Sequence, residues 1–137
     1  IIQAAAGNAN IYGVIIGFEP DYDNLNTKYR LASTRRVCRV MPAWQGILWR
    51  VNCSITIDVD AIGNGYDIVV GSGSTTTGKS GMELDVSTAA TTGTTLRLVD
   101  IERTPDNEIS ASGGAAQTGV NAIVMIVETV ANNGAGT

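Results

Sequence analysis

From Ile47 to Asp60 every second side chain is apolar, and this pattern restricts the fold more than any other feature of the chain. A two-residue period puts the apolar side chains on one face of an extended strand, whereas a helix would distribute them around its axis. We therefore expect one long strand with a buried face and a hydrated face, as in an antiparallel sandwich or barrel. The expected buried face consists of Ile47, Trp49, Val51, Cys53, Ile55, Ile57 and Val59.

The rest of the chain also favours strands, because the other apolar runs are short, rich in β-branched residues and separated by turn residues. About eight strand-like runs are present, and the clearest are 11–18, 28–41, 47–60, 66–70, 82–86, 94–101 and 120–130. We predict a single all-β domain over 1–137, folded as an antiparallel jelly-roll-like sandwich or a small barrel. Residues 110–119 are expected to form a flexible loop, and the tail from about residue 131 is expected to be loose.

The segment from Gly73 to Ser80, GSTTTGKS, matches the phosphate-binding pattern G-x-x-x-x-G-K-[ST]. A phosphate loop of that kind opens a helix, whose N-terminal amides face the phosphates. Here the next residues alternate from Met82 to Val86 and are followed by threonines and glycine, which are poor helix formers. We therefore predict a hairpin between 66–70 and 82–86, and nucleotide binding is only a third hypothesis.

Composition excludes several function classes. The chain has no histidine, so the commonest general base and metal ligand is missing, and we expect neither an enzyme nor a cofactor. Its net charge of −4 argues against nucleic acid as the main partner, because such binding needs clustered positive charge. No apolar run is long enough to span a membrane as a helix.

The cysteines and the acidic turn each allow two interpretations. Cys38 and Cys53 lie equally far from Gln45-Gly46, so a hairpin turning there would place them opposite each other. They would then be either a disulfide or two reduced thiols, and reduced thiols are the favoured interpretation. The carboxylates between Glu19 and Asp23 suggest calcium, but their spacing lacks the glycine and the distal glutamate of a calcium loop, which favours a hydrated turn.

Most of the positive charge lies in one segment, 28–41, which reads KYRLASTRRVCRVM. In an acidic protein, such a segment is either one hydrated face or a docking surface for an acidic partner. Both interpretations stay open here. The charged residues are Lys28, Arg30, Arg35, Arg36 and Arg39.

Four segments carry a resemblance to a known family. In order along the chain they are YGVIIGFE from Tyr12, YRLAST from Tyr29, DIVVGSGSTTTGKSGMELD from Asp67, and Pro-Asp-Asn-Glu from Pro105. From about residue 11 to residue 128 the chain resembles the cement, or decoration, proteins of tailed-phage heads, particularly podovirus-like ones. The segment from Gly71 to Asp85 and the later Pro-Asp-Asn-Glu are the specific part of the likeness.

This resemblance implies a structural virion protein. Such proteins are made in the host cytoplasm, bind the outer surface of the capsid and bridge capsomers of the major capsid protein, which stabilises the DNA-filled head. The resemblance also implies a jelly roll and a small homo-oligomer, with a homodimer as the expected form. The alternative is a carbohydrate- or receptor-binding β-sandwich domain of a phage tail or a secreted protein, since exposed tryptophans suit sugar stacking.

We expect a capsid interface built from two kinds of residue. Arginines would donate charge-assisted hydrogen bonds to capsid carboxylates, and Trp44 at a turn would act as an apolar anchor, whereas Trp49 is expected in the core. The glycine-rich loop from Gly71 to Gly81 has little side-chain bulk and would lie flat on the partner. The full candidate set is Arg35, Arg36, Arg39, Trp44, Gly73, Thr76 and Lys79.

Overall fold

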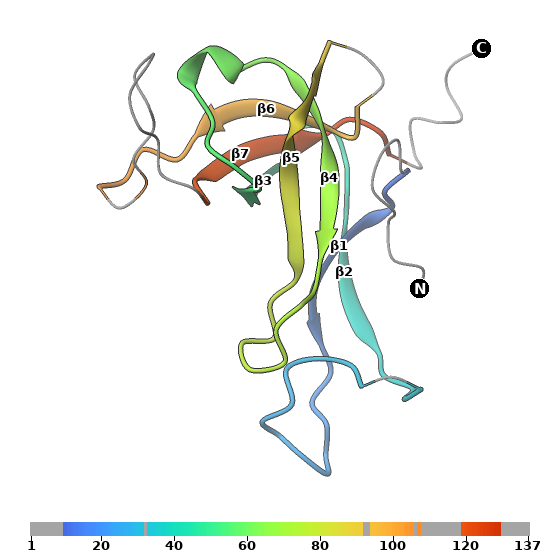
Figure 1. The fold of residues 1–137 in the computed structure, drawn as a ribbon. Helices are drawn as coiled ribbons and strands as arrows, with labels where there is room; N and C mark the ends of the chain where they lie inside the picture. Colours follow the sequence, from blue (N-terminus) through green and yellow to red (C-terminus); the bar gives the residue numbers. More distant parts are fainter. Residues whose placement is uncertain (1–9, 32, 92–93, 106, 108–118, 130–137) are drawn as a thin grey trace, which may run out of the picture.

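The computed structural model describes residues 10–31, 33–91, 94–105, 107 and 119–129. These residues form seven strands and one short 3₁₀ turn, so the all-β prediction is confirmed (Figure 1). In the part of the chain described, no helix is long and apolar enough to cross a membrane. The elements are β1 (Gly13–Phe18), β2 (Cys38–Pro42), β3 (Leu48–Cys53), η1 (Val59–Ala61), β4 (Gly65–Gly71), β5 (Gly81–Ala90), β6 (Leu96–Ile101) and β7 (Asn121–Ile126).

Five strands close into a barrel in the order β3-β5-β4-β6-β7. Neighbouring strands are antiparallel, except that β3 and β5 run parallel and pair only at Asn52–Glu83 and Cys53–Leu84. Of the two predicted architectures, the described strands form the small barrel, and a jelly-roll arrangement is not seen among them. Closure of a sheet into a barrel removes its free edges, which explains how five short strands can enclose a core.

The barrel interior holds the hydrophobic core. Alternate residues of β7 are buried while those between them are partly exposed, so this strand shows the period-two pattern rather than burial on both faces. β7 also ends at Ile126, earlier than the predicted 120–130. The buried apolar residues are Ala43, Cys53, Ile57, Tyr66, Ile68, Leu84, Leu96, Leu98, Ile101, Val120, Ala122, Val124 and Ile126.

The remaining strands, β1 and β2, form a separate two-stranded antiparallel sheet, which we call the arm. Two glycines shape it. A Cβ atom at Gly13 would collide with the carbonyl oxygen of Met41, so the strands approach closely there. The pairing register shifts between Ile15 and Gly17, which indicates a β-bulge or irregularity there. Figure 1 shows the arm extending away from the barrel.

The predicted strand over 47–60 is wrong in its second half. β3 ends at Cys53, and Ile55 is 49% exposed although the pattern predicts it to be buried. The reason is the length of the partner: β7 begins at Asn121, so β3 has no neighbour on that side beyond the Cys53–Val120 hydrogen bond. The chain then enters η1, where the Asp58 carboxylate accepts from the Val59 N–H.

The predicted hairpin at Gln45-Gly46 is also corrected. A turn does form there, and Gly46 adopts a φ of 89° that favours glycine. However, β2 before the turn belongs to the arm and β3 after it belongs to the barrel, so Cys38 and Cys53 do not face each other in one sheet. Both thiols are free, which confirms the reduced interpretation.

Two further predictions concern the segment 28–41 and the β4–β5 hairpin. In the segment 28–41, only the residues from Cys38 onward belong to a strand, β2. The described residues before Cys38 form an irregular loop, because the described part of the chain offers them no neighbouring strand. The hairpin between β4 and β5 is confirmed, and the phosphate-loop pattern leads into strand β5 instead of a helix. Residues 110–118 and the tail from 131 lie outside the described residues.

Candidate docking surface

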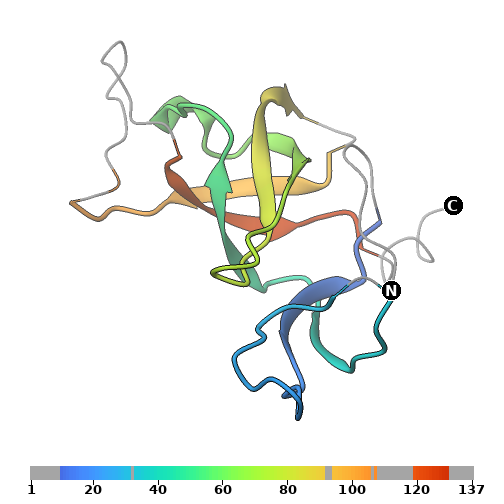
Figure 2. The ribbon, with the colours of Figure 1, turned by 60° about the horizontal axis from the view of Figure 1, so that its bottom comes forward.

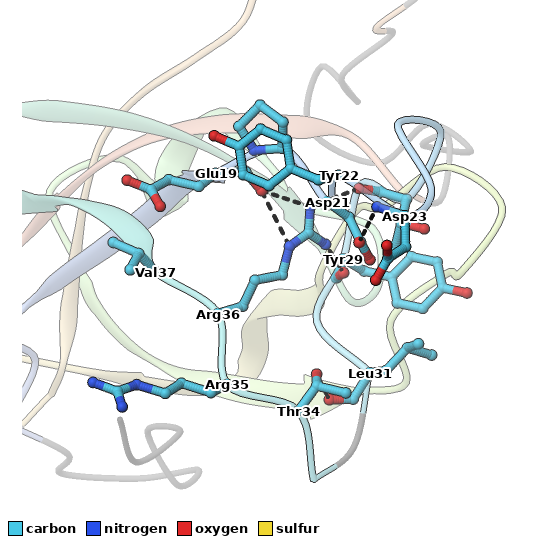
Figure 3. Close-up of a pocket in the computed structure, with 12 residues that line it drawn as sticks. Glu19, Asp21, Tyr22, Asp23, Tyr29, Leu31, Thr34, Arg35, Arg36 and Val37 are labelled. Atoms are coloured by element: carbon cyan, nitrogen blue, oxygen red, sulfur yellow. Dashed lines mark hydrogen bonds between the residues drawn. The ribbon is translucent and has the colours of Figure 1, made fainter.

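The loop of residues 19–37 between β1 and β2 is held in shape by one side chain, Arg36 (Figure 3). Its guanidinium donates from Nε and Nη2 to the carbonyl oxygen of Glu19, from Nη2 to Thr27 at 3.0 Å, and from Nη1 to Tyr29. The same group lies 5.7 Å from the centre of the Phe18 ring. Arg36 therefore ties three points of the loop together, and four of its five N–H groups are used inside the chain.

The fixed loop encloses an open hollow of about 520 Å³. Figure 3 shows Arg36 reaching across it toward the Glu19 and Tyr29 backbone, with the Arg35 side chain directed away from that cluster. Asp21 accepts from the N–H of Asp23, so the acidic residues make a local turn, as the sequence predicts. In the described residues, no group of three or more potential metal ligands is gathered.

The second segment of the site is the tip of the β4–β5 hairpin, residues 72–80. It is fixed by its own hydrogen bonds, among them Gly78 N–H to the Ser74 carbonyl at 2.8 Å and Ser74 N–H to the Lys79 carbonyl at 3.0 Å. Gly78 has a φ of 71°, and a Cβ atom there would lie 2.7 Å from Cβ of Lys28. The tip therefore packs directly against the 19–37 loop.

These two segments, together with β2, form one end of the molecule, which we call the basic end (residues 19–42 and 72–80). Figures 1 and 2 both show the loop and the hairpin tip on the same side of the barrel. The basic end contains six of the nine lysines and arginines and three of the thirteen acidic residues of the chain. It therefore carries a net positive charge, while the rest of the chain is strongly negative.

The cations of the basic end other than Arg36 are available for a partner. Their side chains are exposed, and across the described ranges none of them forms an ion pair. The two ion pairs that are present, Arg50–Glu102 and Arg103–Asp100, belong to the barrel. The available cations are Lys28, Arg30, Arg35, Arg39 and Lys79.

Exposed apolar side chains continue the surface along the arm. Ile16 is 58% exposed at the bulge of β1, and Ile15 and Met41 are exposed on the same two strands. Trp44 is 65% exposed at the turn between arm and barrel, whereas Trp49 packs against the core, as predicted for each. An arm of only two strands has little core of its own, so these side chains gain stability when another surface covers them.

The sequence-predicted interface residues thus fall into three groups. Arg35, Arg39 and Lys79 are exposed at the basic end, and Gly73 and Thr76 are exposed on the hairpin tip beside them. Trp44 lies apart, at the base of the arm. Arg36 differs from the other predicted interface residues, because its guanidinium forms hydrogen bonds within the 19–37 loop. The positive charge of segment 28–41 gives no sign of that structural role.

Sequence reasoning also left out residues of this surface. The charge pattern places Lys28 and Arg30 in the charged segment but gives no sign that they belong to the interface, although the hairpin tip packs beside Lys28. Ile15 and Ile16 are adjacent in a strand, so one of them had to face away from any single buried face. That adjacency was the available signal for an exposed apolar patch.

Among the described residues, Cys53 alone has a large pKa shift, and it lies in the core away from this surface. Burial, and then the negative charge of Glu83, raises the pKa of its thiol to about 11. A thiol with such a pKa is almost entirely protonated at neutral pH and is a poor nucleophile. Cys53 therefore contributes packing and not chemistry.

Comparison with known protein families, with curated protein sequences and with solved structures finds nothing that matches this chain. The arguments for its function consequently rest on its own residues.

Proposed function

We propose that this protein is a cement protein that binds the outer surface of a phage capsid through its basic end. The observation that carries the proposal is the separation of charge: exposed cations from two distant segments are gathered at one end of a strongly acidic chain. A surface of this kind suits an acidic partner, and it orients the protein so that the acidic barrel faces solvent. The resemblance to decoration proteins supports the major capsid protein as that partner.

The fixed shape of the basic end supports the same proposal. Arg36 holds the 19–37 loop, and the Gly78–Lys28 contact holds the hairpin tip against it, so the backbone that carries the cations is already ordered before binding. Preorganisation reduces the entropy that docking costs. A single exposed ion pair contributes little, about 0–1 kcal/mol. Repetition around a closed shell, and bridging by a small homo-oligomer, multiplies that contribution.

The experiment that tests the proposal measures occupancy of purified protein on empty heads by sedimentation. Replacing Arg35 and Arg39 together by Glu reverses two exposed charges at the basic end, and we expect a loss of binding. The control is Arg97→Glu together with Arg103→Glu, which makes the same charge change in and just after β6, also removes the exposed Arg103–Asp100 ion pair, and should preserve binding. Equal occupancy of both double variants would refute docking through the basic end.

One observation favours the alternative, a carbohydrate- or receptor-binding module. Trp44, Tyr12 and Tyr22 are exposed aromatic side chains, which suit stacking on sugar rings. The two functions differ in copy number, because a shell repeats its binding sites and a tail does not. Many copies per purified particle would support the cement protein, and a few copies would support the tail module.

A further inference from the structure

The barrel has one incomplete seam, between β3 and β5. Their parallel pairing consists of Asn52–Glu83 and Cys53–Leu84, and it stops there although β3 begins at Leu48 and β5 at Gly81. On the N-terminal side of these two pairs, β3 is paired only with β7, and β5 is paired only with β4. The two strands therefore separate toward the hairpin tip.

The direction of the backbone groups can be derived from two hydrogen bonds. Cys53 N–H donates to Val120, just before β7, whereas Ser54 N–H donates to Leu84 in β5. Because N–H and C=O groups alternate sides along a strand, the even-numbered residues of β3 point them toward β5. Leu48 and Arg50 therefore aim their backbone N–H and C=O groups into the seam, where the described residues provide no strand partner.

In β5, too, one hydrogen bond shows which backbone groups face the seam. Val86 N–H donates to the Ser54 hydroxyl, which shows that the even-numbered residues of β5 face β3. Met82 N–H also faces the seam, and it donates to the hydroxyl of Ser80 at 3.1 Å, two residues away. A side-chain hydroxyl thus takes the place that a strand partner would occupy.

The separated strands border a hollow of about 440 Å³. Two cations line it, Arg50 and Lys79, and one carboxylate, Glu83, which accepts from the Asn52 side chain at 3.1 Å. Leu48, at the start of β3, is 53% exposed. The hollow therefore combines a β3 edge that lacks a strand partner with Lys79, which forms no ion pair in the described residues, and with Arg50, which forms an exposed ion pair with Glu102 at 3.3 Å. Its lining residues are Arg50, Val51, Asn52, Lys79, Ser80, Met82, Glu83 and Asn121.

We propose that this seam binds an extended acidic peptide segment of a partner protein by strand insertion. The inserted segment lies between β3 and β5 and runs antiparallel to both. It therefore forms one antiparallel ladder with β3 and another with β5, next to the short parallel contact between the two strands. Carboxylates at alternate positions of the segment meet Lys79 and Arg50, and the contact with Arg50 replaces its exposed ion pair with Glu102. Such binding goes beyond capsid docking, because it depends on strand geometry and holds for any extended acidic partner.

The binding test uses a labelled ten-residue peptide of alternating Glu and Val, titrated with the whole protein and monitored by fluorescence anisotropy. We expect saturable binding that is lost with a Lys-Val peptide, because the charge is then repulsive. We also expect loss with a Glu-Val peptide methylated on alternate backbone nitrogens, because that peptide cannot donate to the strand edges. Equal binding of the methylated peptide would overturn strand insertion, and absence of binding by the Glu-Val peptide would overturn the proposal.

Protein variants test each half of the argument. Arg50→Gln combined with Lys79→Gln should weaken binding by about tenfold or more, as expected when charge-assisted hydrogen bonds are lost. The control Arg97→Gln removes an exposed barrel charge elsewhere and should leave binding unchanged. Leu48→Pro removes one seam-facing N–H at the first residue of a strand, where proline is tolerated, and Leu48→Ala is its matched control. If both Leu48 variants bind alike while folded by circular dichroism, the backbone does not contribute and strand insertion is refuted.

Failure of this proposal can be told apart from failure of the proposed function. Heads that bind the protein while the Glu-Val peptide does not would refute the seam alone. A peptide that binds while heads do not would refute the cement function alone.

Discussion

Arg36 shows how one residue can determine the shape of a docking loop. Its planar guanidinium reaches carbonyl oxygens of Glu19, Thr27 and Tyr29, which lie up to ten residues apart in the sequence. A lysine ammonium has no comparable fixed fork and cannot span the same three acceptors. Residue type, and not charge alone, therefore fixes the 19–37 loop.

This role leads to a prediction about stability. Arg36→Gln removes charge-assisted hydrogen bonds and should lower the free energy of unfolding by about 1.5–3 kcal/mol, with faster proteolysis within the 19–37 loop. Arg35→Gln is the matched control, because Arg35 is the neighbouring residue, is exposed and points away from the cluster. Urea denaturation and limited proteolysis with chymotrypsin measure the two effects. Equal stability of the two variants would show that Arg36 does not fix the loop.

The buried thiol of Cys53 makes stability depend on pH. The pKa of Cys53 in the folded protein lies above the value of 9.0 for a free thiol. The contribution of this thiol to the free energy of unfolding is therefore present below pH 9 and is lost as the pH rises toward 11. The free energy of unfolding should fall over this range more in the wild type than in Cys53→Ala, by at most about 3 kcal/mol. Equal pH profiles of both proteins, measured by urea denaturation, would refute the shift.

At the scale of elements, the hairpin tip matters because it joins the barrel to the basic end. Gly78 combines a left-handed φ with a close approach to Lys28. Gly78→Ala should therefore destabilise the tip by about 1–3 kcal/mol and weaken binding to heads. Gly17→Ala is the control, because no atom lies within 4 Å of the position its Cβ would take. Thermal unfolding monitored by circular dichroism tests the first effect, and unchanged behaviour of Gly78→Ala would exclude a structural role.

The arm is the element that would form the contact in the proposed homo-oligomer. Its exposed Ile15, Ile16 and Met41 have no covering surface in the described part of the chain. If a second copy covers them, Ile16→Asp should reduce the oligomer mass measured by light scattering, since burying an unpaired charge is costly. Val99→Asp, on β6 of the barrel, is the matched control. An unchanged mass for Ile16→Asp would exclude the arm as the contact.

At the scale of the whole molecule, the barrel and the arm differ in how they are stabilised. The barrel encloses the core cluster and each of its strands has neighbours on both sides for at least part of its length, whereas the arm has two strands with exposed apolar residues. Local opening should therefore be rarer in the barrel. We expect slow amide hydrogen exchange in β4 to β7 and faster exchange in β1 and β2. Mass spectrometry of exchanged peptides measures this, and equal protection of both sheets in a monomer would contradict it.

The sequence by itself determined the strand-forming character of the chain, the β4–β5 hairpin, the turn at Gln45-Gly46 and the absence of a helix after the phosphate-loop pattern. These features depend on residues close together in the chain, where side-chain period and backbone preference decide the outcome. The tertiary structure alone decided that β3 ends at Cys53, that the cysteines lie in different sheets and that the barrel closes with a short parallel seam. It also decided that Arg36 serves the loop and that Lys28 meets Gly78. These outcomes depend on which distant strand or carbonyl is within reach, and no local pattern encodes that distance.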